Sequence, residues 1–577
     1  MKPILGLDLG TTKCVACVRL GNDFVEISPV SGRFGGKKIL PSVFVHLPSG
    51  KPVVGEDADS EYGADPEFRG QVIRNVKRSM KHNFPEANRT ARKFRSGNRD
   101  FTPAEISGHF LRVLREAAER ETDRLKALPS ASGLDWSNWL DEVVITVPAY
   151  FSPVERRATR QAASLAGFPD AGIHLLDEPV AAALSERIHE QTKSARILVV
   201  DLGGGTCDLT LLETGAKGFR ELGRFGDNEF GGLEWDLEIA KLVALRKYRL
   251  PGVSHLLDDY ATPDYYRFGE LFKESETAKI DFGQNGTLTQ VKVLVKNPDR
   301  PGITGEPVPL TRQEFDEISN ELAEYCGQLA DRLLESVFSK EPKLNRDERG
   351  TWGQVDEVLL VGGGSQLTSV REALQRRLGK PLRIPAGAQL SVARGAAMYG
   401  HVRSRGEKLE GISHPRCPQD VGILVTPVPP KQSVWQKLFR AGTKPAKQNG
   451  KPVTGPAPVF RPLIARNTEL PLPEGVLYEF PLDNDRARRM VLDVCFLQCT
   501  RQMPEGVVRV LRTVRFSGLR RSADPSRDRL EVLLKYDEDY ELRVTANIRD
   551  GDHHDPVTVT IHMDDFGGGE RSTSALK

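Results

Sequence analysis

The pattern of apolar and polar positions divides the chain into two parts of different type. Up to about residue 400, short apolar runs end in Gly- or Pro-rich turns, and helix-like segments follow several of them. This alternation is typical of buried strands that are covered by helices. The clearest predicted strands are 4–7, 143–147, 197–200 and 358–361. The pattern therefore predicts an α/β domain over residues 1–400.

Beyond residue 420 the period of the apolar positions changes to two. Residues 541–548 and 557–562 alternate apolar with polar side chains, and acidic turns such as 483–485 separate segments of this kind. Strict alternation indicates half-buried antiparallel strands. We therefore predict an all-β sandwich domain over 421–563. The charged stretch 401–420, which Gly and Pro interrupt, is predicted to be an interdomain linker.

An insert in the β domain departs from this alternation. Residues 428–459 contain six prolines, six Lys or Arg residues and no acidic residue. This composition cannot build an apolar core, so a mobile basic loop is predicted. The loop either contacts an acidic surface of a partner or is a solvated loop without a partner. The last residues, 564–577, are predicted to form a disordered tail.

Composition and charge narrow the class of protein. The chain has 577 residues, of which 39% are hydrophobic and 28% charged, as in globular proteins of about three to five structural units. The 81 Lys and Arg residues nearly balance the 79 Asp and Glu residues, which argues against a nucleic-acid partner. No run reaches the ~18 consecutive apolar residues of a membrane span. Because Asp8 comes too early for a signal peptide, we expect a cytoplasmic protein.

The cysteines agree with a reducing compartment. There are seven, an odd number, and they are scattered along the chain. Cys14 and Cys17 have CxxC spacing, but they lie in a strand-like run, where positions three apart point to opposite faces. This argues against a metal or redox pair.

Two similar loops follow two of the predicted strands. Asp8-Leu-Gly-Thr-Thr12 follows strand 4–7, and Asp201-Leu-Gly-Gly-Gly-Thr206 follows strand 197–200. Glycine lets backbone N–H groups come close to a phosphate, and an Asp at a strand end can hold Mg²⁺ through water. Two unrelated strand–turn segments are the alternative. Two copies in the same context favour two similar lobes that grip one polyphosphate.

Two further segments carry groups suited to a nucleotide site. Residues 361–364, Val-Gly-Gly-Gly, follow a buried strand, and Ser365 is predicted to cap a helix that ends at Gly379. By itself this junction is either a nucleotide contact or a packing turn. Pro179 disfavours a helical conformation at Glu178, so the Glu178 carboxylate is expected at a helix start. A plain helix cap is the alternative for this residue.

Taken together, these segments resemble the 70-kilodalton heat shock chaperone family (DnaK-like). The resemblance is strong over about 1–400 and weak over about 419–563. It implies an α/β actin-like two-lobed ATPase domain followed by an all-β sandwich domain. The segments that carry it are 6–12, 147–151, 177–184, 201–206, 226–227, 231–232 and 395–397. Sugar kinases and filament-forming actin relatives share the Asp-Gly-Thr loops but not the run Pro-Ala-Tyr-Phe at 148–151.

The resemblance implies a site for ATP or ADP with Mg²⁺ between the lobes. Asp8 and Asp201 would anchor Mg²⁺ through its waters. Lys77 would lie at the γ-phosphate, where its alternative reading is a solvated helix lysine, and Glu178 and Thr206 would order the attacking water. The implied nucleotide contacts are Gly10, Thr11, Thr12, Lys13, Gly203, Gly204, Gly205, Gly231, Gly232, Glu276, Lys279, Gly362, Gly363 and Gly364.

Other positions match the family's regulation or depart from its pattern. Pro148 and Arg156 match the relay between nucleotide state and domain docking. In the adenosine pocket, Gln366 replaces an arginine of the family, Gly364 a serine and Gln389 a carboxylate. Losing the arginine removes a cation–π face worth roughly 0.5–2 kcal/mol, so weaker and less selective ATP binding is expected. The aliphatic linker of the family is interrupted, and its helical lid is expected to be absent.

The resulting hypothesis is an ATP-dependent chaperone. It would hydrolyse ATP to control the binding of unfolded polypeptide by a lidless β-sandwich, with co-chaperones such as a J-domain protein and a nucleotide exchange factor as further partners. One alternative is a non-cycling ATP-binding scaffold, or an exchange-factor-like relative, that binds a dedicated protein partner. Another is a filament-forming actin relative. The β domain counts against it, because polymer contacts need free lobe surfaces.

Overall fold

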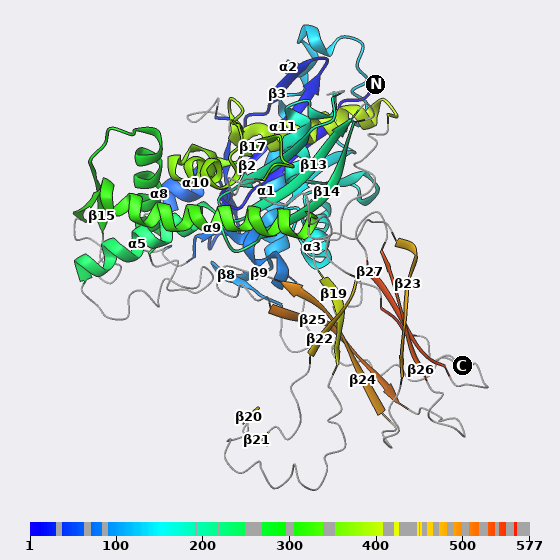
Figure 1. Ribbon diagram of the computed structural model, residues 1–577. Helices are drawn as coiled ribbons and strands as arrows, with labels where there is room; N and C mark the ends of the chain where they lie inside the picture. The colour runs from blue at the N-terminus through cyan, green and yellow to red at the C-terminus, as the bar shows by residue number, and fades with distance from the viewer. Residues whose placement is uncertain are drawn as a thin grey trace.

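The structure is a computed structural model that describes most of residues 1–407 and, beyond them, only strands between Asp420 and Ile561 (Figure 1). The residues of the first part that it does not describe are 30–36, 63–67, 69–70, 84–90, 191–192, 216–217, 249–267, 296–304 and 339–351. Most of the predicted linker, most of the basic insert and the tail 564–577 also lie outside the described residues.

Two sheets of the same topology form the α/β part. Each has an antiparallel three-stranded meander whose first strand is extended by two parallel strands. The first lobe is built on the order β11–β10–β1–β2–β3, with bounds Ile173–Asp177, Val143–Val147, Leu5–Leu9, Lys13–Leu20 and Asp23–Glu26. The second lobe is built on the order β14–β13–β12–β17–β18, with bounds Gly218–Asp227, Cys207–Gly215, Arg196–Leu202, Glu357–Val361 and Leu382–Arg383. The apolar strands predicted from the sequence are all found.

Helices pack on and between these sheets. In the first lobe α1 (Pro103–Arg120) packs on α3 (Pro153–Leu165), and in the second α9 (Arg312–Phe338) packs on α10 (Thr368–Leu378). Helices α4 (Glu178–Ser185) and α11 (Ser391–Ser404) pack against each other, and α4 contacts strands of both sheets. A Cβ atom on Gly395 of α11 would overlap the backbone of Ala181 in α4. Glycine at this position lets the two helices touch where the lobes meet.

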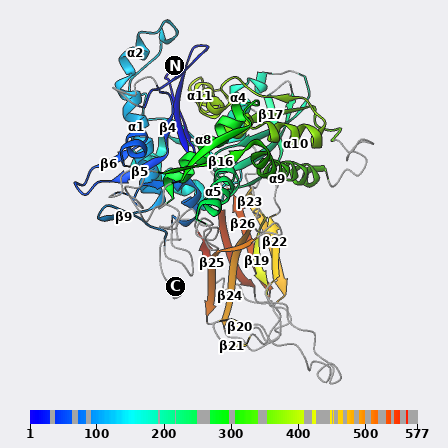
Figure 2. The same ribbon diagram turned by 90° about the vertical axis from the view of Figure 1, so that its left-hand side faces the viewer.

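Smaller elements are added to each lobe. The first lobe adds the sheet β6–β5–β7 (Pro52–Val54, Val43–His46, Ile73–Arg74), the hairpin β8–β9 (Phe94–Ser96, Arg99–Phe101) and the 3₁₀ turn η2 (Val76–His82). The second lobe adds α5 (Gly232–Tyr248), α8 (Gly269–Gln284) and the hairpin β15–β16 (Gln290–Val295, Glu306–Thr311). Among these elements, β5, β7, α5 and α8 line a cavity between the lobes. Figure 2 shows the view turned by 90°, with α5 and α8 on the side that faces the reader.

The predicted β region contains two antiparallel four-stranded sheets, which Figures 1 and 2 show below the α/β part. The first has the order β22–β19–β24–β25, with bounds Val459–Ile464, Asp420–Val425, Arg489–Gln498 and Val507–Ser517. The second has the order β23–β26–β27–β28, with bounds Leu472–Pro481, Arg529–Tyr536, Leu542–Arg549 and Val559–Ile561. Side-chain burial alternates along β26 as predicted, because Val532 and Leu534 are buried whereas Leu533 between them is only partly buried. Two short strands, Lys447–Gln448 and Lys451–Pro452, pair within the insert.

Among the helices of the described ranges, none carries an apolar stretch long enough to cross a lipid bilayer. Cys14 and Cys17 are free, buried and in different core clusters, which confirms that their side chains point to opposite faces of β2.

Candidate functional site

The two glycine loops predicted from the sequence lie against each other where the lobes meet. A Cβ atom on Gly204 would overlap the side chain of Thr12, and one on Gly205 would overlap the side chain of Thr11. Only glycine allows this approach, because any larger residue would force the loops apart. The first loop is also fixed by Ser42, whose amide donates to the Thr12 carbonyl at 2.8 Å. The prediction of two facing loops is confirmed by this geometry.

The second loop is a closed turn with its own partners. The Gly203 amide donates to the Thr206 carbonyl at 3.0 Å, which closes the turn, and the Gly232 amide donates to the Gly203 carbonyl at 2.9 Å. Gly231 packs on the backbone of Gly204 and Gly205, so closely that a Cβ atom would lie 2.8 Å from them. The predicted contact residues 231–232 therefore pack against the backbone of this loop and hydrogen-bond to it.

A buried ion pair lies beside the loops. The Lys77 ammonium, on η2, is 2.5 Å from a carboxylate oxygen of Glu178 at the start of α4, and the two side chains are only 4% and 8% exposed. The reading of Lys77 as a solvated helix lysine is therefore wrong. We expected Glu178 to lie just before the helix, because Pro179 disfavours a helical conformation at the residue that precedes it. Glu178 is instead the first residue of α4, since proline is tolerated in the first turn of a helix.

Four carboxylates and one ammonium group form the centre of this cluster. Asp8 lies near the end of β1 and Asp201 near the end of β12, and Asp208 stands directly opposite Asp201 in the antiparallel β12–β13 pair. Asp208 and Asp201 are both buried, and like charges placed opposite each other repel. One oxygen of Asp208 has no hydrogen-bond partner within the described part. Within the described ranges no three of these carboxylates are placed to ligate one metal ion directly, so a cation that relieves the repulsion would have to be held through water.

Burial and neighbouring charges shift the pKa values of the groups in this cluster. Burial, together with the charge of Glu178, raises the pKa of Asp8 to about 7 and the pKa of Asp208 to about 7. Burial and the same neighbouring charges raise the pKa of Asp201 as well. The pKa of Lys77 is also raised, since the attraction of Glu178 and Asp8 outweighs its burial. Lys77 is therefore a permanent cation in a carboxylate-rich centre.

Residues 148–151, the Pro-Ala-Tyr-Phe run, tie this centre to the second lobe. The Tyr150 amide donates to Asp208 at 3.1 Å, and the Asn228 side chain donates to the Tyr150 carbonyl at 3.3 Å. The Lys77 ammonium lies 5.6 Å from the centre of the Phe151 ring, within cation–π range. The run therefore contacts a carboxylate of one lobe and the lysine of the other.

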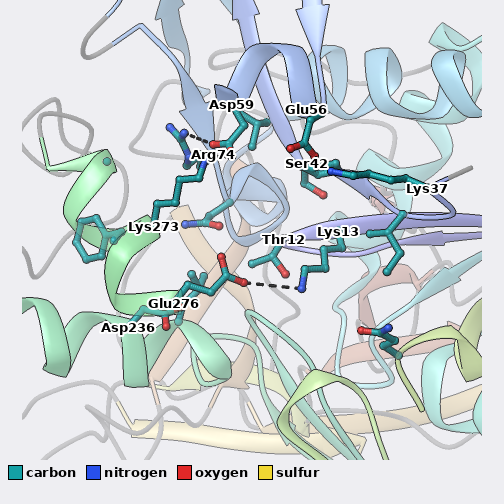
Figure 3. A pocket seen from close by; sticks show the side chains of 18 of the residues that line it. Thr12, Lys13, Lys37, Ser42, Glu56, Asp59, Arg74, Asp236, Lys273 and Glu276 are labelled. Carbon is teal, nitrogen blue, oxygen red and sulfur yellow. Dashed lines mark hydrogen bonds and ion pairs between the residues drawn. The ribbon is translucent and has the colours of Figure 1, made fainter. Parts of the chain in front are cut away.

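A cavity of about 560 Å³ opens beside the first loop (Figure 3). Such a volume is typical of small-molecule sites. Both lobes line it, and its walls include Thr12, Lys13, Asp59, Lys273 and Glu276. Lys13 and Glu276 point toward each other across it, with 3.9 Å between ammonium and carboxylate. Both were predicted nucleotide contacts, and the structure places both in the lining of the cavity, one from each lobe.

The predicted adenosine side is only partly assembled around this cavity. The Lys279 ammonium is engaged by Asp236 at 2.8 Å and by the Gly232 carbonyl at 3.0 Å. Gln389, which replaces a family carboxylate, lines the cavity. A Cβ atom on Gly364 would overlap the Leu202 side chain, so glycine there is required by packing in this chain.

The third glycine loop packs on the second. Gly362 has φ of 79°, and a Cβ atom on it would overlap Asp201 and the Leu202 backbone. The Ser365 hydroxyl donates back to the Gly362 carbonyl at 2.8 Å, in a short 3₁₀ turn over Gly363–Gln366. The prediction that Ser365 caps the following helix is therefore wrong, because this helix begins at Thr368. Its predicted end is confirmed, since Gly379 has the left-handed conformation.

Sequence reasoning missed three groups at the site. Asp208 had a weak signal, as an acidic residue near the start of the strand that follows the second loop. Arg78 had none. Its guanidinium forms two bonds of 2.8 and 2.7 Å with Glu234 and donates to the Gly205 carbonyl at 2.9 Å. Arg224, which is described below, had none either. The partners of Arg78 lie more than a hundred residues away, and Ala149 lies 75 residues from Arg224, so no local pattern shows them.

Comparison with known proteins identifies the family. The family model described as Hsp70 protein matches residues 4–414, more than half of the chain. The chain therefore belongs to the Hsp70 family, and the resemblance predicted from its motifs is confirmed. The family has an actin-like ATPase domain at its N-terminal end, which agrees with the two lobes of equal topology.

Two relatives extend this result. The chain is 30% identical over 403 residues to the "Chaperone protein DnaK" of Mycoplasmopsis synoviae and, to the same extent, to that of Mycoplasmopsis agalactiae. In each case the match covers 69% of this chain and 58% of the relative. The chain thus matches less than two thirds of the length of these chaperones.

Proposed function

We propose that the α/β part, residues 1–400, binds ATP with Mg²⁺ between its lobes and hydrolyses it. The observation that carries this proposal is the junction of the two glycine loops, with the buried Lys77–Glu178 pair beside it. Phosphoryl transfer needs little covalent chemistry from a protein. It needs positioned donors, a metal ion and a cation at the transferred group.

The residues divide these tasks as follows. Backbone groups of 10–13 and 203–205 hold the phosphates, with the hydroxyls of Thr11 and Thr12. Asp8 and Asp201 would hold Mg²⁺ through its waters, and the bound ion would supply positive charge to the phosphates. Lys77 stabilises the charge that develops on the transferred phosphoryl group. Glu178 and Thr206 orient the attacking water, and the Glu178 carboxylate accepts a proton from it.

On the nucleoside side, Glu276 and Lys279 contact the base and the ribose, and residues 231–232 and 362–364 support the phosphates and the sugar. Gln366 and Gln389 offer amide groups in place of the charged groups of the family. We therefore propose that ATP binds more weakly than usual in the family, and that other purine triphosphates compete with it. Strong selection of ATP over GTP in competition binding would contradict this.

We further propose that residues 421–563 form a β-sandwich that binds extended polypeptide, with the linker in the part of 401–420 that follows the end of α11 at Ser404. The two antiparallel sheets over β19–β28 support this, since an exposed sheet edge or groove can bind a strand-like peptide. Pro148 and Arg156 would relay nucleotide state to this domain. The partners proposed are unfolded polypeptide, a J-domain protein and a nucleotide exchange factor. That the domain acts without a lid stays a prediction.

One pair of assays tests this function. Single-turnover hydrolysis of ATP with Mg²⁺ is measured with and without an unfolded peptide, and release of a fluorescent peptide is followed in ATP and in ADP. We expect slow hydrolysis that the peptide accelerates, and peptide release within seconds that ATP changes only modestly. ATP binding without hydrolysis would instead favour a scaffold. Retention of the peptide for minutes in ADP would contradict lidless binding.

A further inference from the structure

Four buried charged side chains form one continuous chain across the junction of the lobes. Arg156 of α3 donates to one carboxylate oxygen of Asp177, and Arg224 of β14 lies 2.7 Å from the other. Arg224 also forms two bonds of 2.6 and 2.5 Å with Glu221. The four side chains are between 1% and 6% exposed. Two positive and two negative charges thus compensate each other out of contact with water.

Arg224 is the member that crosses from one lobe to the other. It belongs to the outer strand of the second sheet, whereas Asp177 ends β11 of the first sheet. Its guanidinium also donates to the Ala149 carbonyl at 3.1 Å, inside the Pro-Ala-Tyr-Phe run. One side chain of the second lobe therefore binds two separate segments of the first.

Both segments lead directly to the catalytic centre. Asp177 immediately precedes Glu178, which pairs with Lys77. Ala149 immediately precedes Tyr150, whose amide donates to Asp208, and Phe151 lies beside Lys77. A shift of Arg224 would move Glu178 and Phe151 together, and misplacement by about 1 Å at a reacting centre can cost about a hundredfold in rate.

We infer that Arg224 is a positioning residue for hydrolysis: from the second lobe it holds Asp177 and Ala149, and through them it sets the place of Glu178 and Lys77. This inference rests on the proposed ATP hydrolysis. The bonds described for Arg224 go to Glu221, Asp177 and Ala149, all outside the glycine loops, so its loss should lower the rate of the chemical step and leave nucleotide affinity nearly unchanged. Glu221 orients the guanidinium by binding its far side.

The test must not leave a buried charge without a partner, because this alone could unfold the protein. The variant Arg224→Met/Glu221→Met removes one positive and one negative charge and leaves the Arg156–Asp177 pair intact. The matched control is Arg196→Met/Glu213→Met, an arginine–glutamate pair at 3.2 Å on the same sheet, at the end away from the loops. The conservative variant Arg224→Lys keeps the charge but cannot reach all three acceptors at once.

Single-turnover hydrolysis, ADP affinity and the melting temperature are measured on the full chain. We expect the double variant to lose about tenfold or more in rate with ADP affinity within about twofold, Arg224→Lys to lie between it and the wild type, and the control to match the wild type. An unchanged rate in the folded double variant overturns the inference, as does an equal loss of rate and affinity. If the double variant does not fold, Arg224→Lys decides by the same two measurements. A wild-type chain that binds ATP without hydrolysing it overturns the proposed function, and the inference with it.

Discussion

The two lobes share a strand order but contribute different chemistry. The first lobe supplies the hydroxyls of Thr11 and Thr12, the Lys77 ammonium and the Glu178 carboxylate. The second lobe supplies the bare glycine loop 203–205 and two buried aspartates opposite each other. Neither lobe carries both the cation and the facing loop, so the complete site exists only where they meet.

This difference teaches how a duplicated topology can build one catalytic centre. The same strand–loop position ends in a carboxylate in both sheets, which suits a metal ion held between them. The two sides of the site are chemically different, because the first lobe adds a cation and the second adds a glycine loop. The predictions below test this division of tasks, beginning with the largest expected effect.

Removing the cation of the first lobe should abolish most of the chemistry. Lys77→Ala is expected to lower single-turnover hydrolysis about 10²–10³-fold and ADP affinity only slightly, because the ammonium acts mainly on charge that develops in the transition state. Lys81→Ala is the control, since Lys81 lies on the same 3₁₀ turn but pairs with Glu229. An equal loss in rate and affinity would show that Lys77 only clamps the ground state.

Adding one carbon to the second lobe should separate the loops. In Gly205→Ala, the new methyl group would overlap the Thr11 side chain, and overpacking of this kind costs about 1–3 kcal/mol. We expect ATP affinity to fall about tenfold, as measured by titration calorimetry. Gly286→Ala is the matched control, because no atom lies within 4 Å of a Cβ placed there. Unchanged affinity in Gly205→Ala would mean that the loops do not act together.

The buried Asp8 and Asp208 should make stabilisation of the fold by Mg²⁺ and ADP depend on pH. Because burial raises the pKa of Asp8 and of Asp208 to about 7, from a usual value near 4, the folded protein without ligand keeps protons that the unfolded chain loses. Its stability from these groups is greatest below about pH 4 and falls as the pH rises to 7. Mg²⁺ competes with these protons, so its stabilising effect should grow over the same range.

Melting temperatures between pH 5.5 and 8, with and without Mg²⁺ and ADP, check this. We expect the ligand-induced shift to be at least about 1 °C larger at pH 8 than at pH 5.5, because about 1 kcal/mol corresponds to about 1 °C in a domain of about 400 residues. Asp208→Asn should flatten the dependence. A shift that is independent of pH in the wild type would show that the carboxylates are already ionised without the metal.

The smallest effect is expected at the rim of the cavity. The Asp59 carboxylate of the first lobe forms an ion pair with the Lys273 ammonium of α8 in the second lobe, with 2.8 Å between oxygen and nitrogen. Lys273 is about half exposed, so the pair contributes little. Lys273→Met should speed ADP release by up to about fivefold in a stopped-flow displacement assay. Arg95→Met, which breaks an exposed pair within one hairpin, should change nothing. Slower release in Lys273→Met would contradict a closing role for the pair.

Local sequence determined the parts of this protein that depend on neighbouring residues. Apolar runs followed by a carboxylate, glycines and hydroxyls predicted the strands, the loops 8–12 and 201–206 and the repeat of two lobes. They could do so because about ten consecutive residues are enough to specify a buried strand and the glycine turn after it. The same reasoning failed at Ser365, where the hydroxyl bonds to Gly362 and so does not cap the helix. A local signal is ambiguous when two partners are equally near.

Tertiary structure alone decided which distant groups face each other. Lys77 meets Glu178 across 101 residues of sequence, Arg78 meets Glu234 across 156, and Arg224 meets Asp177 across the lobe junction. In sequence each of these cations resembles an ordinary surface residue. Each becomes buried because tertiary packing brings the carboxylate of another element to it, and because an unpaired charge could not remain there.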